Sequence, residues 1–262
     1  PQGSVLGPLF ALIYLNDLSN RTQNDILFFA DDTSLYAPHT PETLSATQNS
    51  MQLDLDEIQK YGKEWFITFN ENKTTQQTFS HKHQNQTPML TFGGVPIPVT
   101  DTHRHLGLTF SKDLRFHAHV NDTLNKANKS LSPLYSLAQH LPRNTLDNIY
   151  KTYIRPYLDY CDTIYDGHIT IRDNTRLEIF QNRVARLVTG ALFRTPSDKL
   201  RSELGWDKLE TRRKTHRLLL YHKIVASEHH MPNYITTLLP RSRVHDTNRL
   251  LRNSSQHTQP QT

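Results

Sequence analysis

The sequence predicts an α+β fold: antiparallel hairpins and helices over residues 1–112, then an all-helical region over residues 113–240. Up to about residue 110, short apolar runs separated by turn residues alternate with helical periodicity, whereas from about residue 115 only the helical period remains. Charge divides the chain in a similar way: residues 1–100 carry 5 Lys+Arg against 10 Asp+Glu, and residues 101–262 carry 25 against 15. This asymmetry favours cation binding in the first part and polyanion binding in the second. Residues 241–262 have too few apolar side chains to fold, and we expect them to be disordered.

The first expected elements are a short amphipathic helix and a β-hairpin. The helix follows a loop at residues 1–4, because apolar residues recur at helical spacing from Leu6 to Tyr14. The hairpin pairs a buried strand at residues 26–30 with a returning strand at residues 33–36, so Asp31 and Asp32 form its turn.

A long helix and several short strands follow. Thr40 and Pro41 suit the first positions of a helix, and an apolar period of three to four residues continues to near Gly62. Strands are expected at residues 65–69, 76–79, 89–92, 95–99 and 106–110, with a glycine pair at 93–94 as one turn.

The second part reads as helices. Apolar residues from Val120 to Ala138 step by three and four, although Pro133 should kink or end that helix. A second helix spans residues 172–188 with arginines along one face, a short helix closes at Gly205, and a basic helix covers residues 208–226.

Composition excludes several protein classes. The longest apolar run is interrupted by Gly7 and Pro8, so no transmembrane span is expected. Cys161 is the single cysteine, which excludes an internal disulfide framework and fits a reducing compartment. The chain opens on Pro1, and we expect it to be a piece of something longer.

The adjacent carboxylates of Asp31 and Asp32 are the strongest candidate for chemistry. Two neighbouring acids at the end of an apolar strand repel each other unless a cation compensates them, and hard oxygen ligands suit Mg²⁺. At a turn both side chains can approach one site, with Asp31 as the direct ligand and Asp32 as the weaker one. A solvated turn pair is the plain alternative.

Several motifs in order resemble reverse transcriptases of jockey-like non-LTR retrotransposons. Residues 1–18, PQGSVLGPLFALIYLNDL, resemble the P-Q-G-S-x-L-G-P box, and Phe29-Ala30-Asp31-Asp32 resembles the F/Y-A-D-D box. Residues 70–74, NENKT, are similar to the N-x-K-T segment after that hairpin, and residues 105–107, HLG, to the Y-L-G of the primer-grip hairpin. The likeness continues through helical segments to about residue 228.

The resemblance implies RNA-directed DNA polymerisation by two Mg²⁺ ions on an RNA template and DNA primer, with dNTPs as substrates. It implies a partial palm over residues 1–112 and a thumb-like helical region after it. Asp31 and Asp32 supply part of the metal site, while the remaining metal-binding Asp and the fingers lie upstream of the P-Q-G-S box. We therefore expect this chain alone to be inactive.

The resemblance also assigns further contacts. Gln2, Gly3, Phe29 and Ala30 are expected to contact nucleotide and template, and Lys73 to assist pyrophosphate departure. Leu106 and Gly107 are expected to lie against the primer. The residues expected to contact the nucleic-acid backbone are Lys126, Lys129, Arg176, Arg183, Arg186, Arg212 and Arg213. For each of these a plain loop, strand or solvated helix face is the alternative.

Two rival interpretations remain open from the sequence. The first is a non-catalytic nucleic-acid-binding remnant of a decayed element, which keeps the basic helices without chemistry. The second is an unstable fragment, because a missing palm strand would leave the hairpin with an unprotected edge.

Overall fold

A computed structural model of the chain describes residues 6–80 and 87–226, together with residue 235. The elements up to residue 111 are α1 (Gly7–Asn16), η1 (Asp17–Asn20), β1 (Asp25–Phe29), β2 (Asp32–Tyr36), α2 (Leu44–Trp65), η2 (Glu71–Lys73), β3 (Thr91–Phe92), β4 (Val95–Pro96), β5 (Thr102–His105) and β6 (Leu108–Ser111). The later elements are the helices α3 (His117–Leu137), α4 (Arg143–Ile149), η3 (Tyr150–Ile154), α5 (Arg155–Asp159), α6 (Asp162–Tyr165), α7 (Ile171–Thr189), α8 (Ser197–Leu204) and α9 (Leu209–Ala226). The predicted α+β fold class is confirmed.

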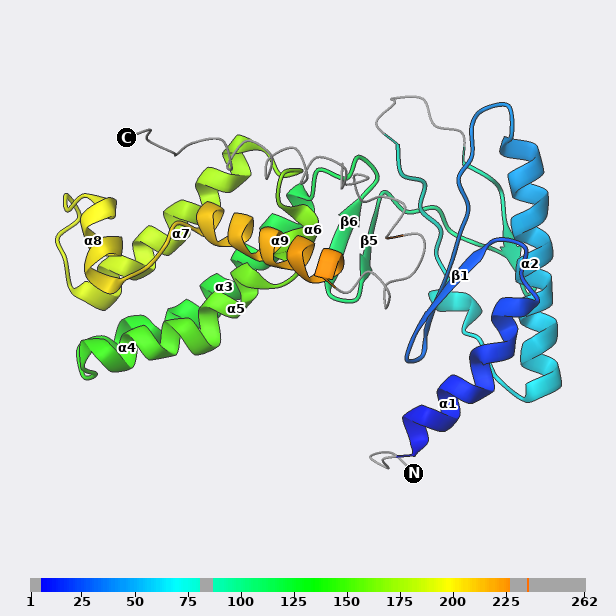
Figure 1. Cartoon of the computed structure of the whole chain (residues 1–262), viewed down its shortest axis with the longest axis horizontal. Coiled ribbons are helices and arrows are strands. Elements are labelled where there is room, and N and C mark those ends of the chain that lie inside the picture. Colours follow the sequence, from blue (N-terminus) through cyan, green and yellow to red (C-terminus); the bar gives the residue numbers. More distant parts are fainter. Residues whose placement is uncertain (1–5, 81–86, 227–234, 236–262) are drawn as a thin grey trace, which may run out of the picture.

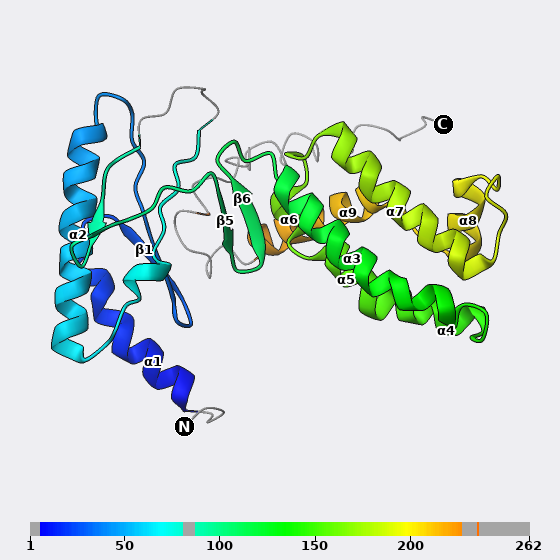
Figure 2. The same cartoon turned by 180° about the vertical axis from the view of Figure 1, so that it is seen from behind.

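The molecule is elongated (Figure 1). Helices α1 and α2 and the β1–β2 hairpin form one end, and α4 and α8 form the other, with the β5–β6 hairpin between them (Figures 1 and 2). Within the described residues, β1 pairs with β2, β3 with β4 and β5 with β6, and each pair is a separate two-stranded antiparallel sheet. The β5–β6 hairpin therefore lies where the two parts of the chain meet.

The first part has a small core built on one face of α2. Leu55, Ile58 and Tyr61 of α2 are buried, and they pack with side chains from the β1–β2 and β3–β4 hairpins. Tyr61 donates a hydrogen bond from its hydroxyl to the Tyr14 carbonyl at 2.6 Å, which holds α1 to α2. The predicted helix α1 is confirmed, but its apolar residues do not form a buried face, since none of its side chains is buried.

The helical part has a larger core formed mainly by α3 and α7. Successive turns of α3 bury one face that includes Val120, Leu124 and Leu131, and α7 packs against it through Leu177 and Val184. This face of α3 is the one that the sequence period predicts. A third, smaller cluster of Leu108, Phe116 and Tyr165 joins the β5–β6 hairpin to the helices.

Several element boundaries differ from the prediction. Helix α2 begins at Leu44 rather than at Pro41 and continues past Gly62 to Trp65, because Trp65 stacks on Tyr61 of the preceding turn with ring centroids 5.8 Å apart. The strand predicted at residues 65–69 is therefore wrong. The strand predicted at residues 76–79 is reduced to one bridge between Gln76 and Val99.

Two further corrections concern Pro133 and the last hairpin. Helix α3 continues through Pro133, since the flanking Leu131 and Leu134 are both buried in the core and outweigh one lost backbone bond. The strand predicted at residues 106–110 is instead the turn and returning strand of a hairpin, with Leu106 and Gly107 between β5 and β6. The tail predicted to be disordered, residues 241–262, lies outside the described residues.

Candidate nucleic-acid and metal site

The β1–β2 hairpin carries the two candidate metal ligands. Its last strand pair joins Phe29 to Asp32, so Ala30 and Asp31 form a two-residue turn in which Ala30 has a φ of 53°. Asp31 and Asp32 are both exposed, and neither carboxylate has an ion pair within the described residues. The prediction that both form the turn is corrected: Asp31 is at the tip and Asp32 begins β2. Their carboxylates are free to bind a cation.

Buried contacts hold this hairpin in place. Asp54 of α2 is 1% exposed, and its carboxylate accepts hydrogen bonds from the backbone N–H groups of Gln23 at 2.7 Å and Asn24 at 2.9 Å. Along β1, Ile26 and Phe28 pack on the core, whereas Phe29 is exposed on the other face. Strand alternation thus orients Phe29 away from α2.

A cavity of about 570 Å³ brings together motifs that lie far apart in the sequence. Phe29 from the hairpin, Leu106 and Gly107 from the β5–β6 turn, and Lys126 from α3 all line it. The sequence assigned these four residues to three separate motifs. Asp31 and Asp32 are not among the lining residues, so the cavity lies beside the hairpin and meets it at Phe29.

The β5–β6 turn is fixed against α5. Tyr160, at the end of α5, donates a hydrogen bond from its hydroxyl to the Leu106 carbonyl at 2.5 Å. Its ring also covers Gly107, where an added Cβ atom would lie 3.1 Å from the ring. The close approach needs a glycine and couples the hairpin to the helices.

His119 of α3 lies behind this turn. It is 4% exposed, and its Nδ1 accepts a hydrogen bond from the Thr109 N–H at 3.4 Å. The pKa of His119 is lowered to about 4, mainly by burial. The charge of Asp122 raises this pKa, whereas the charges of Lys126 and Arg104 lower it. The imidazole is therefore neutral near pH 7.

Other predicted contact residues are not gathered at the cavity. Gln2 and Gly3 lie outside the described residues. Lys73 ends the short helix η2, where its backbone N–H donates to the Asn70 side chain at 3.2 Å, and it does not line the cavity. Lys129 is exposed on α3, also away from the cavity lining.

The predicted arginines of α7 are engaged with neighbouring side chains. Arg176 pairs with Asp173 at 3.0 Å and donates to Asn121. Arg183 donates to Asn128 of α3, and Arg186 lies over the ring of Phe193 at 5.7 Å. These contacts tie α7 to its neighbours, and backbone binding by the three arginines stays a prediction.

The arginines of α9 are structural in the described conformation. Arg213 is 2% exposed and pairs with Asp166 at 3.4 Å, and its contact with nucleic acid stays a prediction. The plain alternative of a solvated helix face does not hold for Arg213, because α9 packs against α6 and buries this side chain. Arg212 pairs with Asp159 at 2.7 Å. Burial lowers the pKa of Arg212, but the hydrogen bond to the Asp159 carboxylate and its negative charge raise it, and the pKa is raised overall.

Comparison with known proteins shows which family the first part of the chain resembles. The family described as "Reverse transcriptase (RNA-dependent DNA polymerase)" matches residues 1–110, which hold the hairpin, Leu106 and Gly107. The chain is also similar to the probable RNA-directed DNA polymerase from transposon X-element of Drosophila melanogaster, with 29% identity over 72% of this chain and 21% of the relative. Residues 1–110 therefore match the reverse transcriptase family, and the chain is similar to RNA-directed DNA polymerases of non-LTR retrotransposons.

Further similar reverse transcriptases come from the jockey element. The RNA-directed DNA polymerase from mobile element jockey of Drosophila melanogaster is 26% identical over 73% of this chain and 22% of its own length. The protein of the same description from Drosophila funebris is 25% identical over 73% of this chain and 22% of its own length. The chain thus spans about a fifth of these relatives. No solved structure gives a significant match.

Reverse transcriptases use divalent metal ions and act on nucleic acids. The hairpin offers such an ion two carboxylates, those of Asp31 and Asp32. This number suffices for Mg²⁺ only when substrate phosphates and water supply its other ligands. Among the described helices, none has the length and apolar character needed to cross a bilayer.

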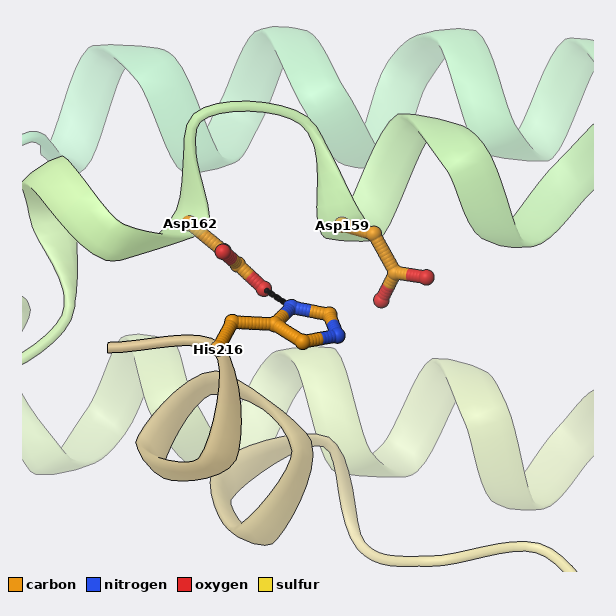
Figure 3. Close-up of side chains that lie close together, drawn as sticks. All are labelled: Asp159, Asp162 and His216. Carbon is orange, nitrogen blue, oxygen red and sulfur yellow. Dashed lines mark hydrogen bonds and ion pairs between the residues drawn. The ribbon is translucent and has the colours of Figure 1, made fainter. Parts of the chain in front are cut away.

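A second group of possible metal ligands lies in the helical part, where sequence reasoning placed none. Ligand atoms of Asp159, Asp162 and His216 all lie within 4.8 Å of one another (Figure 3). The Asp162 carboxylate accepts a hydrogen bond from His216 Nδ1 at 2.6 Å, and burial raises the pKa of Asp162. Asp159 is neutralised by Arg212, with Arg155 also at 3.4 Å. The group is an ion-pair network that holds α9 against α5 and α6.

Sequence reasoning missed part of the cavity wall. Arg104 of β5, Tyr157 of α5 and Tyr160, which follows α5, also line the cavity near Leu106 and Gly107. The tyrosines belong to a segment noted for its family likeness without an assigned role. No helical spacing could have found this pair, because α5 ends at Asp159 and Tyr160 has an extended backbone.

Proposed function

We propose that this chain supplies the metal-binding hairpin and the primer-holding surface of an RNA-directed DNA polymerase. One observation carries the proposal: Phe29, which precedes Ala30 and Asp31, lines the same cavity as Leu106 and Gly107, about 80 residues later. A hairpin that binds metal and a turn that holds a primer end must lie on the same cavity for nucleotide addition. The boundary near residue 112 remains part of the proposal, supported by the separate cores on either side of it.

In this proposal Asp31 and Asp32 hold divalent cations, with Mg²⁺ as the ion that two hard carboxylates favour. When bound, such ions lower the charge on the attacking primer oxygen and on the leaving pyrophosphate. Asp31 is the stronger ligand because it occupies the tip, while Asp32 is held in β2 by its pairing with Phe29. The hairpin itself is held rigid by the buried Asp54 contacts.

The cavity walls position the nucleic acid. Leu106 and Gly107 are placed to contact a DNA primer paired with an RNA template, and Lys126 to contact a phosphate. Gln2, Gly3, Ala30 and Lys73 remain proposed contacts of the template and the incoming dNTP. Within this proposal the chain alone polymerises little, because two carboxylates hold metal weakly and nucleotidyl transfer depends on accurate positioning.

The test places this chain in a longer polymerase. The matched segment of the jockey polymerase is replaced by the chain, and extension of a DNA primer on RNA is measured with dNTPs and Mg²⁺. We expect Asp31→Asn to reduce extension by about 10²-fold or more. Asp25→Asn is the matched control, since Asp25 is an exposed aspartate at the far end of β1, and it should leave extension unchanged.

Extension that survives Asp31→Asn would contradict the proposal. A chimera that binds primed RNA but gives no extension, with or without Asp31, would support the alternative of a non-catalytic nucleic-acid-binding remnant.

A further inference from the structure

The cavity beside the hairpin is rimmed by exposed aromatic rings. Phe29 is 61% exposed, Tyr160 is 50% exposed and Tyr157 is 39% exposed, and all three line the same cavity. Tyrosines of the core, such as Tyr150 and Tyr165, are each 1% exposed. Exposed rings also occur elsewhere on the surface, but these three share one cavity, where a planar ligand can contact them together.

The charge of the lining selects an anion. Arg104 and Lys126 both line the cavity, and neither has an ion pair within the described residues. The lining contains no Asp or Glu, and His119 adds no charge near neutral pH. An apolar peptide would leave both cations uncompensated, whereas a nucleic-acid strand offers bases to the rings and phosphates to the cations.

Size and rigidity suit one nucleotide. The volume of about 570 Å³ lies within the ~300–1,000 Å³ of small-ligand sites, which is too small for a duplex. Tyr160 is fixed by its hydrogen bond to Leu106, while Tyr157 has no side-chain hydrogen bond within the described residues. One ring is therefore pre-positioned, and the other is free to close on a base.

We propose that Tyr157 and Tyr160 form a stacking platform for the base of an unpaired or terminal nucleotide, with Arg104 and Lys126 contacting its flanking phosphates. The proposal rests on the nucleic-acid function proposed above and adds a base-binding role that the family motifs do not assign to these residues. It requires no catalysis, so binding alone tests it.

The experiment measures binding of the full 262-residue chain to a fluorescently labelled DNA primer on RNA by anisotropy. Tyr157→Ala should weaken binding about tenfold, the scale of one lost base–aromatic stack, whereas Tyr157→Phe should stay within about twofold. Tyr135→Ala is the matched control, because Tyr135 is 46% exposed on α3 and lies outside the cavity lining.

A second probe separates stacking from other effects. A primer with an abasic terminal nucleotide should bind the wild type about tenfold more weakly, and Tyr157→Ala should cost no further affinity with that probe. The slope of the logarithm of the binding constant against the logarithm of the salt concentration counts the released ions. Lys126→Gln should lower this slope by about one, whereas Tyr157→Ala should leave it unchanged.

The outcomes distinguish the two proposals. Equal affinity of Tyr157→Ala and wild type, or an equal loss with the abasic probe, would overturn the platform. A platform that passes this test while the chimera shows no Asp31-dependent extension would overturn only the polymerase function.

Discussion

The contact between Gly107 and Tyr160 gives a sharp prediction about how the two parts of the chain are coupled. Gly107→Ala places a methyl group 3.1 Å from the Tyr160 ring in a residue whose φ is 82°. Gly94→Ala is a close control, because Gly94 has a φ of 81° and an added Cβ there meets nothing within 4 Å. Both substitutions carry the same backbone cost of about 1 kcal/mol.

Gly107→Ala has an additional cost. The methyl group displaces the Tyr160 ring and weakens its 2.5 Å hydrogen bond to Leu106, which adds about 1 kcal/mol. Urea titrations followed by circular dichroism should therefore show a loss of about 2 kcal/mol in the free energy of unfolding for Gly107→Ala, against about 1 kcal/mol for Gly94→Ala. In a Tyr160→Ala background the two glycine variants should become equal. Equal losses in the wild-type background would refute the reasoning.

Three further predictions concern other parts of the site. Asp54→Ala should lower the free energy of unfolding by about 2 kcal/mol, because it leaves the N–H groups of Gln23 and Asn24 without an acceptor. A loss below about 0.5 kcal/mol in urea titrations would contradict this. The low pKa of His119, about 4, means that its stabilising contribution is complete above its ordinary value of 6.5 and is lost as the pH falls from 6.5 to 4. His119→Gln should therefore lose less stability than the wild type between pH 7 and pH 4.5, and equal losses would count against the assignment. The chain by itself should give little or no primer extension with Mg²⁺, and Asp31-dependent extension would show that its two carboxylates suffice.

Local patterns predicted the hairpin and the helices, and long-range contacts account for what the sequence did not show. Alternating and helical periods are properties of neighbouring residues, so β1, β2 and the buried face of α3 could be predicted. The register of the turn could not, because Ala30 adopts a positive φ for which alanine gives no signal. The approach of Tyr160 to Gly107 joins residues 53 positions apart, which no local pattern records.

The basic residues illustrate a second limit. On a helical wheel an arginine such as Arg213 looks solvated, but it is buried against Asp166, which follows α6, and Asn174 of α7. Lys126 is also a basic residue on a predicted helix, yet it lines the cavity. The difference depends on which elements pack together, and a single sequence does not contain that information.

Paramagnetic broadening by Mn²⁺ in NMR spectra of the full chain tests most directly whether the hairpin tip binds a divalent cation beside the cavity. The account predicts that amide signals of residues 29–33 broaden first, followed by those of Leu106 and Gly107, and that Asp31→Asn abolishes this effect while Asp25→Asn preserves it. Broadening centred on Asp159, Asp162 and His216, with the hairpin signals unchanged, would contradict it.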